Sequence, residues 1–164
     1  MPNPDASLLK VRRSIHINAS PERVWQAFTS KSQMDQWWGL TKGSSEAGQT
    51  KGQWLTAYEP HLGGRVEMAV MWAGTRARYG GVIKAFETAK ELTFENDWIP
   101  NRGWVAPTFI TLRLTAALGG TLVELFHYGF EGTGGDAGTE HAGYETGWGM
   151  TQLNALRALI EEAK

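Results

Sequence analysis

Two side chains in the C-terminal third of the sequence, His127 and Glu145, are of the types that general acid–base chemistry uses. A carboxylate held beside an imidazole could move protons to and from a bound molecule, provided that both face one cavity. The alternative, which the sequence favours, is that they hydrogen-bond each other or a water molecule, as buried polar groups must. His127 and Glu145 are therefore candidates for catalysis, and an enzyme is the less favoured interpretation.

Metal and cofactor motifs give weaker signals. His141 and Glu145 are one helical turn apart and could form half of a metal site, but no further ligands follow at a recognisable spacing. The segment from Gly132 to Ala137 fits the GxGxxG/A pattern of dinucleotide-binding loops. Its strand, however, belongs to an antiparallel series, and no later parallel strand carries an acid for the ribose. We expect no metal ion and no cofactor, and interpret this segment as a flexible loop.

The composition excludes several classes of function. The chain has 164 residues, a net charge of −1, 20 glycines, eight tryptophans and no cysteine. Near-neutral charge argues against nucleic acid or an anionic membrane as the partner, and no apolar run approaches the ~20 residues of a membrane helix. The first ten residues lack the basic start and apolar run of a signal peptide. We therefore expect a soluble, cytoplasmic protein.

The segment from Gly143 to Lys164 has the periodicity of one long amphipathic helix. One face is apolar from Leu153 onward, but nearer its start it carries Glu145, Gly149 and Gln152. Small and polar residues cannot fill a close-packed interior, and a glycine inside a helix costs about 1 kcal/mol relative to alanine. We predict that the second half of this helix packs on a sheet while the first half covers a cavity.

Alternation of apolar and polar residues predicts the strands. The first covers residues 9–17, and two short helices follow it, one capped by Ser20 with Pro21 at its first position and one at residues 32–38. Six more strands are expected, with connections short enough for antiparallel neighbours, at residues 53–58, 64–73, 77–87, 91–98, 108–116 and 121–130. Residues 1–7 show no pattern and are interpreted as a flexible tail.

The loop from Gly39 to Gly52 is polar and unusually long, which is typical of functional or disordered loops. It follows Trp37 and Trp38, which could be anchors at a cavity mouth or part of a partner surface. Adjacent helical positions point about 100° apart, so we expect the two rings not to lie equally deep. The hypothesis is that this loop and the tryptophan pair form a mobile entrance.

Several short runs, in this order and spacing, resemble a known superfamily. They are Ile17–Trp25, Gln36–Gly39, Gly81–Ile83, Leu92–Phe94, His127–Phe130 and Gly147–Trp148. The sequence is similar, over about residues 10–163, to the Bet v 1-like or START-like (SRPBCC) helix-grip proteins, especially the branch related to the C-terminal domain of the Hsp90 ATPase activator. The resemblance implies an α+β fold with a curved, antiparallel, seven-stranded sheet around a long C-terminal helix. It also implies a hydrophobic-ligand cavity between sheet and helix. It does not fix the function, because one fold hosts many functions.

Alternation proposes which residues face that cavity. Val66, Met68, Val70 and Trp72 share one face of their strand, and Leu92, Phe94, Asn96 and Trp98 share one face of another. On the last strand alternation leaves two sets open, and the resemblance favours the set of Val123, Leu125 and His127. The candidate ligand-binding residues are Trp37, Trp38, Trp54, Tyr58, Met68, Val70, Trp72, Phe94, Trp98, Leu125, His127, Glu145, Trp148, Gly149 and Gln152.

We therefore expect a single domain over residues 1–164 that binds an apolar or aromatic small molecule between sheet and helix. One alternative is a polyketide cyclase/dehydratase-like enzyme that uses His127 and Glu145. Another is an Hsp90-interacting, co-chaperone-like domain, which is less favoured because the Hsp90 activator has an additional N-terminal domain. A homodimer is a further expectation.

Overall fold

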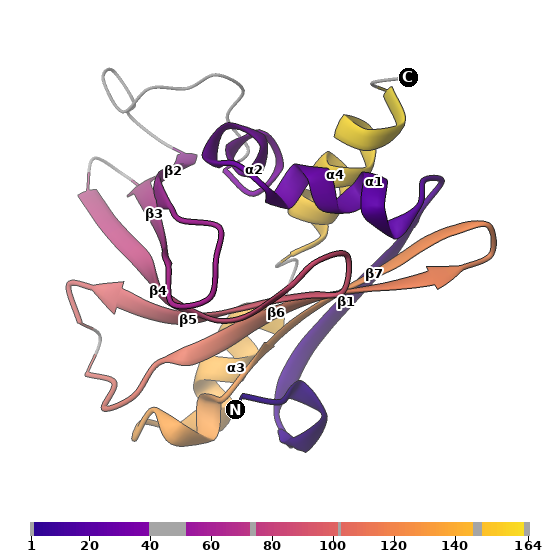
Figure 1. Ribbon diagram of the computed structural model, residues 1–164. Helices are drawn as coiled ribbons and strands as arrows, with labels where there is room; N and C mark the ends of the chain where they lie inside the picture. The colour runs from indigo at the N-terminus through magenta and orange to yellow at the C-terminus, as the bar shows by residue number, and fades with distance from the viewer. Residues whose placement is uncertain (1, 40–51, 73–74, 102, 146–148, 163–164) are drawn as a thin grey trace.

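The computed structural model describes residues 2–39, 52–72, 75–101, 103–145 and 149–162. Seven antiparallel strands form one sheet in the order β1-β7-β6-β5-β4-β3-β2 (Figure 1). The strands are β1 (Lys10–Ile17), β2 (Gly52–Tyr58), β3 (Arg65–Trp72), β4 (Thr75–Glu87), β5 (Glu91–Ile99), β6 (Thr108–Ala117) and β7 (Gly120–Tyr128). The α-helices are α1 (Pro21–Trp25), α2 (Lys31–Trp37), α3 (Ala137–Glu145) and α4 (Met150–Glu162). Three short 3-10 helices are η1 (Pro4–Ala6), η2 (Gln26–Phe28) and η3 (Phe130–Gly132).

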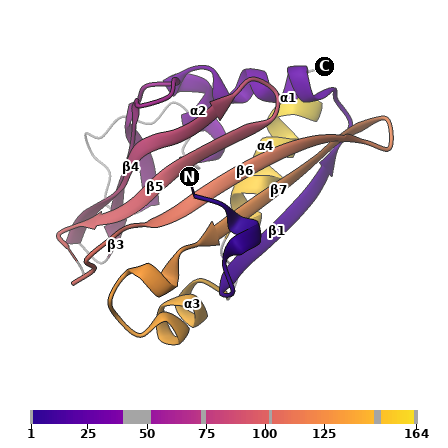
Figure 2. The same ribbon diagram turned by 60° about the horizontal axis from the view of Figure 1, so that its bottom comes forward.

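The layers follow from the apolar faces of these elements. Helices α1, α2 and α4 lie on the same side of the sheet (Figure 1), and α3 lies at one end of it, below β7 and β1 (Figure 2). Leu153, Leu156 and Ile160 of α4 are buried in the core cluster together with side chains of α1, α2 and the sheet. The expected α+β architecture, with two short helices after β1 and a C-terminal helix on the sheet, is confirmed.

The helix starts are set by side-chain caps. Ser20 accepts a hydrogen bond from the backbone N–H of Arg23, and Pro21 occupies the first turn of α1, as predicted. Ser30 caps α2 in the same way, accepting from Gln33 N at 3.2 Å. Each cap satisfies a backbone N–H that the first helical turn leaves without a partner. The starts of α1 and α2 are therefore set by hydrogen bonds between residues close in sequence.

The prediction of one continuous helix from Gly143 is wrong. Helix α3 ends at Glu145 and α4 begins at Met150, with Gly149 between them at a left-handed φ of +95°. A Cβ atom at Gly149 would lie 2.8 Å from Leu125 Cδ2 and 3.3 Å from Arg13 Cγ. Backbone conformation and close packing therefore require glycine here. It does not border a cavity from inside a helix, so this support for a cavity under α4 is lost.

Trp37, the last residue of α2, and Trp38, which follows it, are both deep in the core, contrary to the expectation that they would not lie equally deep. Trp37 is 0% exposed and Trp38 is 1% exposed. The ring of Trp37 lies 5.0 Å from that of Phe28, and its Nε1 donates to the carbonyl of Ala27 at 3.0 Å. Trp38 packs edge-on against Phe94 of the sheet, with 5.8 Å between ring centroids. The two rings point in different directions, but η2 buries one and the sheet buries the other.

The N-terminal residues, expected to be a flexible tail, include η1. Asp5 lies 3.6 Å from Arg113, and the hydroxyl of Ser7 donates to the carboxylate of Glu131 at 3.2 Å. These contacts join the start of the chain to β6 and η3. The loop expected at residues 39–52 falls almost wholly outside the described residues, and so does the entrance hypothesis that rests on it.

Candidate functional site

A cavity of about 140 Å³ lies on the core side of the sheet, at one end of it. Its walls come from the start of β2, the end of β3, the start of β4, the ends of β5 and β7, the early part of β6, and helix α3. The lining residues are Gln53, Val70, Tyr79, Asn96, Trp98, Ile110, His127 and Tyr144. The cavity thus lies between the sheet and α3, whereas α4 packs on the core farther along the strands.

Aromatic rings form much of the wall. Tyr79 and Trp98 are neighbours on β4 and β5, with ring centroids 5.1 Å apart. His127 and Tyr144 meet edge to face with centroids 4.3 Å apart. The indole Nε1 of Trp98 donates to the hydroxyl of Tyr144 at 3.0 Å, which joins the sheet to α3 across the site. Ring faces and edges are therefore available to a bound planar group.

Three polar side chains at the inner wall form a network. Thr108 donates its hydroxyl hydrogen to the backbone carbonyl of Asn96 at 3.1 Å. Thr108 Oγ1 also lies 2.7 Å from His127 Nε2, and the same Nε2 lies 3.4 Å from Asn96 Nδ2. Asn96 turns its Nδ2 toward the same Thr108 oxygen at 3.3 Å. No donor among the described residues reaches the buried Asn96 Oδ1.

The site carries no ionised side chain near neutral pH. Burial, with a smaller contribution from nearby His141, lowers the pKa of His127 to about 3. Burial also raises the pKa of Tyr79 above its usual value. The described lining residues contain no Asp, Glu, Lys or Arg. The described lining therefore offers neutral hydrogen-bonding groups, of which Asn96 and His127 are buried.

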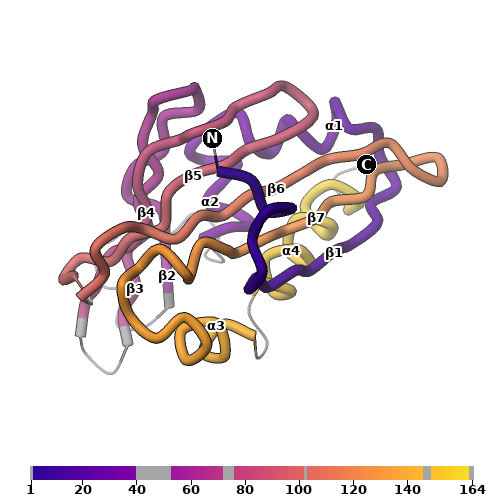
Figure 3. The backbone as a smooth tube through the Cα atoms, turned by 90° about the horizontal axis from the view of Figure 1, so that it is seen from below, coloured from indigo at the N-terminus to yellow at the C-terminus, as the bar shows by residue number. Residues whose placement is uncertain are grey.

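Polar contacts hold helix α3 beside the cavity. No residue of α3 is fully buried, and the helix lies against the ends of β7 and β1 (Figure 3). His141 Nε2 lies 3.0 Å from the carbonyl of Lys10 on β1 and 3.3 Å from the Glu145 carboxylate. Glu145 also lies 3.8 Å from Arg13. Only Tyr144 of this helix lines the cavity.

The prediction that Glu145 faces the cavity is wrong. Its side chain is 51% exposed, and its carboxylate contacts Arg13 and His141. The break before α4 turns α3 away from the direction that a continuous helix would give it. His127 and Glu145 therefore do not form an acid–base pair. His141 and Glu145 do interact across one helical turn, and the described residues contain no group of three or more potential metal ligands.

Most inward-facing residues were predicted correctly from alternation. Val66, Met68, Leu92 and Phe94 are 0% exposed in the core, and Val70, Asn96 and Trp98 continue the same faces into the cavity wall. The set containing Leu125 and His127 faces inward on β7, as the resemblance indicated. Of the proposed ligand-binding residues, Val70, Trp98 and His127 line the cavity. Trp37, Trp38, Met68, Phe94 and Leu125 fill the core beside it.

The remaining candidates lie elsewhere. Trp54 is buried but alternates with core residue Leu55, so it lies on the opposite face of β2, with Arg76 5.9 Å from its ring. Tyr58 packs in the core and donates to the carbonyl of Phe28 at 2.6 Å. Gln152 is buried on α4. The side chains of Trp72 and Trp148 lie outside the described part of the structure.

Sequence reasoning missed four of the lining residues. Gln53 and Ile110 were available from alternation, because they share faces with Leu55 and Leu112 respectively. Tyr79 lies beside Arg76 and Arg78 in the sequence, which is typical of a solvated strand edge, but it lines the cavity. No sequence pattern indicated that Tyr144 lines the cavity, because its position depends on where α3 ends.

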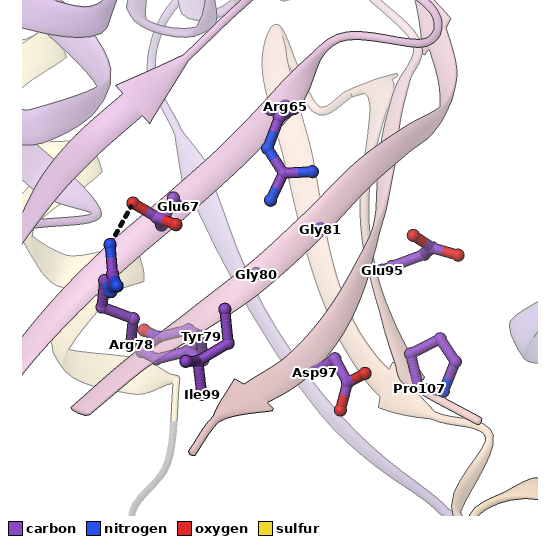
Figure 4. A pocket seen from close by; sticks show the side chains of 10 residues that line it. All are labelled: Arg65, Glu67, Arg78, Tyr79, Gly80, Gly81, Glu95, Asp97, Ile99 and Pro107. Atoms are coloured by element: carbon purple, nitrogen blue, oxygen red, sulfur yellow. Dashed lines mark ion pairs between the residues drawn. The ribbon is translucent and has the colours of Figure 1, made fainter. Parts of the chain in front are cut away.

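A second hollow, of about 250 Å³, lies on the opposite face of the sheet (Figure 4). Gly80 and Gly81 form its floor, and charged side chains surround it. Figure 4 shows Arg78 turned toward Glu67, at 3.6 Å, with Glu95 and Asp97 on the other rim. These charges are of both signs and largely balance, so this groove offers no defined recognition chemistry. The cavity beside α3, with its aromatic and uncharged lining, is the better candidate site.

Comparison of the sequence with models of protein families identifies the family of this chain. Residues 18–161 match the model described as "Activator of Hsp90 ATPase homolog 1-like protein". The chain belongs to this AHSA1-like family. A comparison with curated protein sequences finds no match. Within the described residues of this AHSA1-like chain, no helix is long and apolar enough to cross a membrane.

Solved structures show the same fold at low sequence identity. A protein from Arthrobacter aurescens is 18% identical with a TM-score of 0.69, and the match covers 99% of this chain and 90% of that one. A protein from Mycobacterium smegmatis is 15% identical with a TM-score of 0.67, covering 100% and 97%. The structure titled as the Aha1 dimer from Colwellia psychrerythraea is 17% identical with a TM-score of 0.59, covering 96% and 100%. These likenesses concern the fold.

Proposed function

We propose that this AHSA1-like protein binds a small aromatic or apolar molecule in the cavity between the sheet and α3. The observation that carries the proposal is a concave space of about 140 Å³ whose lining is mainly aromatic and aliphatic with a few convergent polar groups. This is the usual composition of a small-molecule site. A cavity of roughly this volume accommodates a benzene-sized molecule.

The enzyme alternative is less well supported. His127 has no carboxylate partner in Glu145, and a pKa of about 3 makes its imidazole a weak base near neutral pH. Efficient proton transfer needs a pKa near the working pH. Binding without turnover is therefore the function that these side chains support.

The binding test compares the wild-type protein with one cavity-filling variant. Toluene is titrated into labelled protein, and changes in amide NMR shifts near Asn96 and His127 report binding. Val70→Phe should abolish these changes, because Val70 lines the cavity and the larger ring occupies it. Val105→Phe is the matched control, because Val105 is 81% exposed. Absence of saturable shifts in the wild type, or equal binding by Val70→Phe, would contradict the proposal.

A second candidate function is an interaction with Hsp90, and the match to the activator family over residues 18–161 favours it. The test is stimulation of Hsp90 ATPase activity by the purified chain, together with co-sedimentation of the two proteins. If the chain neither stimulates the ATPase nor forms a complex with Hsp90 at micromolar concentrations, this function is excluded.

The relative from Colwellia psychrerythraea that is described as a dimer supports a homodimer as the assembly of this chain. Light scattering coupled to size-exclusion chromatography measures the mass directly. A concentration-independent mass of one 18.1 kDa chain would contradict the dimer.

A further inference from the structure

The polar wall of the cavity indicates which chemical class of ligand it takes. Asn96 is 2% exposed and lines the cavity. Its Nδ2 lies 3.3 Å from Thr108 Oγ1, whereas its Oδ1 has no hydrogen-bond donor among the described residues. A buried amide oxygen left without a donor costs about 1–3 kcal/mol, so it is a strong acceptor for any group brought into the cavity.

The neighbours of Asn96 cannot easily supply that donor. The hydroxyl hydrogen of Thr108 is used by the backbone carbonyl of Asn96, and Nε2 of His127 is turned to Thr108. The network thus fixes the amide with its nitrogen toward the protein. The Asn96 oxygen is therefore a hydrogen-bonding atom that a ligand can use.

The other walls limit the charge, size and shape of the ligand. The described lining has no ionised group, so a charged ligand would lose its hydration without gaining a counter-charge. The volume of about 140 Å³ suits one six-membered ring with a small substituent. Tyr79 and Trp98 on one side and Tyr144 on another present rings against which a planar molecule packs.

We propose that the cavity selects neutral, single-ring aromatic molecules that carry a hydroxyl or N–H group, and that Asn96 Oδ1 is the acceptor that selects them. This inference rests on the proposed binding function and adds the ligand class and the residue that determines specificity.

Phenol and toluene form a matched pair for the test, because they have nearly the same shape and differ in a hydroxyl against a methyl group. Dissociation constants are measured by amide NMR shifts for phenol, toluene, methoxybenzene, benzaldehyde and benzoate. Phenol should bind about tenfold or more tighter than toluene, as one buried hydrogen bond predicts. Methoxybenzene and benzaldehyde, which lack a donor, should bind no better than toluene, and benzoate should bind most weakly.

The variant Asn96→Leu replaces the amide by an apolar group of similar size. It should remove the preference for phenol while toluene binding is retained, and its circular dichroism and Tm show whether it folds. Equal binding of phenol and toluene to the wild type would overturn the ligand class, even if Asn96→Leu does not fold. Tighter binding of benzaldehyde than of phenol would do the same, because it would require a protein donor. A phenol preference that survives in folded Asn96→Leu would overturn the role of Asn96. If neither phenol nor toluene binds the wild type, the binding function itself fails.

Discussion

Nε2 of His127 lies 2.7 Å from Oγ1 of Thr108 on the neighbouring strand, in a site that excludes solvent. This contact joins β7 to β6 beneath the cavity, and it places a titratable ring where its charged form is strongly disfavoured. The consequences of this arrangement, and of the packing around it, can be measured.

His127 should make stability depend on pH. Its pKa is about 3 in the folded protein, below its ordinary value of 6.5. Between these values the unfolded chain binds more protons, so the free energy of unfolding falls as pH falls. His127→Gln should reduce this slope by up to about 1.4 kcal/mol per pH unit between about pH 6 and about pH 4, with no change of slope above about pH 7.5.

Urea denaturation at a series of pH values measures that slope. His61→Gln is the control, because His61 lies in an exposed turn before Gly63, and it should leave the wild-type slope unchanged. If the free energy of unfolding depended on pH in the same way in His127→Gln and in the wild type, the inference that His127 is buried in its neutral form would be contradicted.

Gly149→Ala should lower the free energy of unfolding by about 1–3 kcal/mol, through the left-handed φ of +95° and the crowding of Leu125. Gly143→Ala, in α3, is the matched control, because a Cβ there meets no atom within 4 Å. That change should be neutral or stabilising by up to about 1 kcal/mol. Thermal denaturation measures both variants. A Gly149→Ala protein as stable as the wild type would restore the cavity explanation for this glycine.

Helix α3 should exchange its amide hydrogens faster than α4. It has no fully buried residue, whereas α4 buries Leu153, Leu156 and Ile160. Glu145→Ala removes the contacts to Arg13 and His141 and should speed exchange in α3 further, with a change in global stability below about 1 kcal/mol because the carboxylate is half exposed. Glu140→Ala, on the same helix, is the control. Hydrogen exchange with mass spectrometry resolves the two helices, and equal protection of α3 and α4 would contradict this prediction.

Asp35 should stabilise the contact between α2 and β2. Its Oδ1 accepts from the backbone N–H of Leu55 at 2.8 Å, and both groups are buried. Asp35→Ala leaves that N–H without its acceptor and should cost about 1–3 kcal/mol, measured by urea denaturation. Asp5→Ala, at an exposed ion pair with Arg113, should change stability by less than about 0.5 kcal/mol. Similar effects of the two changes would show that the Asp35 bond contributes little.

The sequence by itself determined the strands, the antiparallel pairing of consecutive strands after the two short helices, and many of the residues that face inward. Alternation is a local property with a period of two, so Met68 and Phe94 could be assigned to the core face once one neighbour was assigned. On β7 alternation left two sets open, and the family resemblance selected the set with Leu125. The cap at Ser20 is equally local, because its hydrogen bond spans three residues. These features needed no knowledge of distant contacts.

The tertiary structure alone decided how the cavity closes. Glu145 and Arg13 are 132 positions apart in the chain, and their contact joins α3 to β1 beside the cavity that Tyr144 lines. A helical wheel assumes an unbroken helix with 3.6 residues per turn. It therefore cannot show the left-handed backbone conformation at Gly149, where the helical structure is interrupted. The burial of both Trp37 and Trp38 depends on two separate layers meeting at the end of α2. Local periodicity fixes which way a side chain points within its own element, but the packing of distant segments decides what it meets.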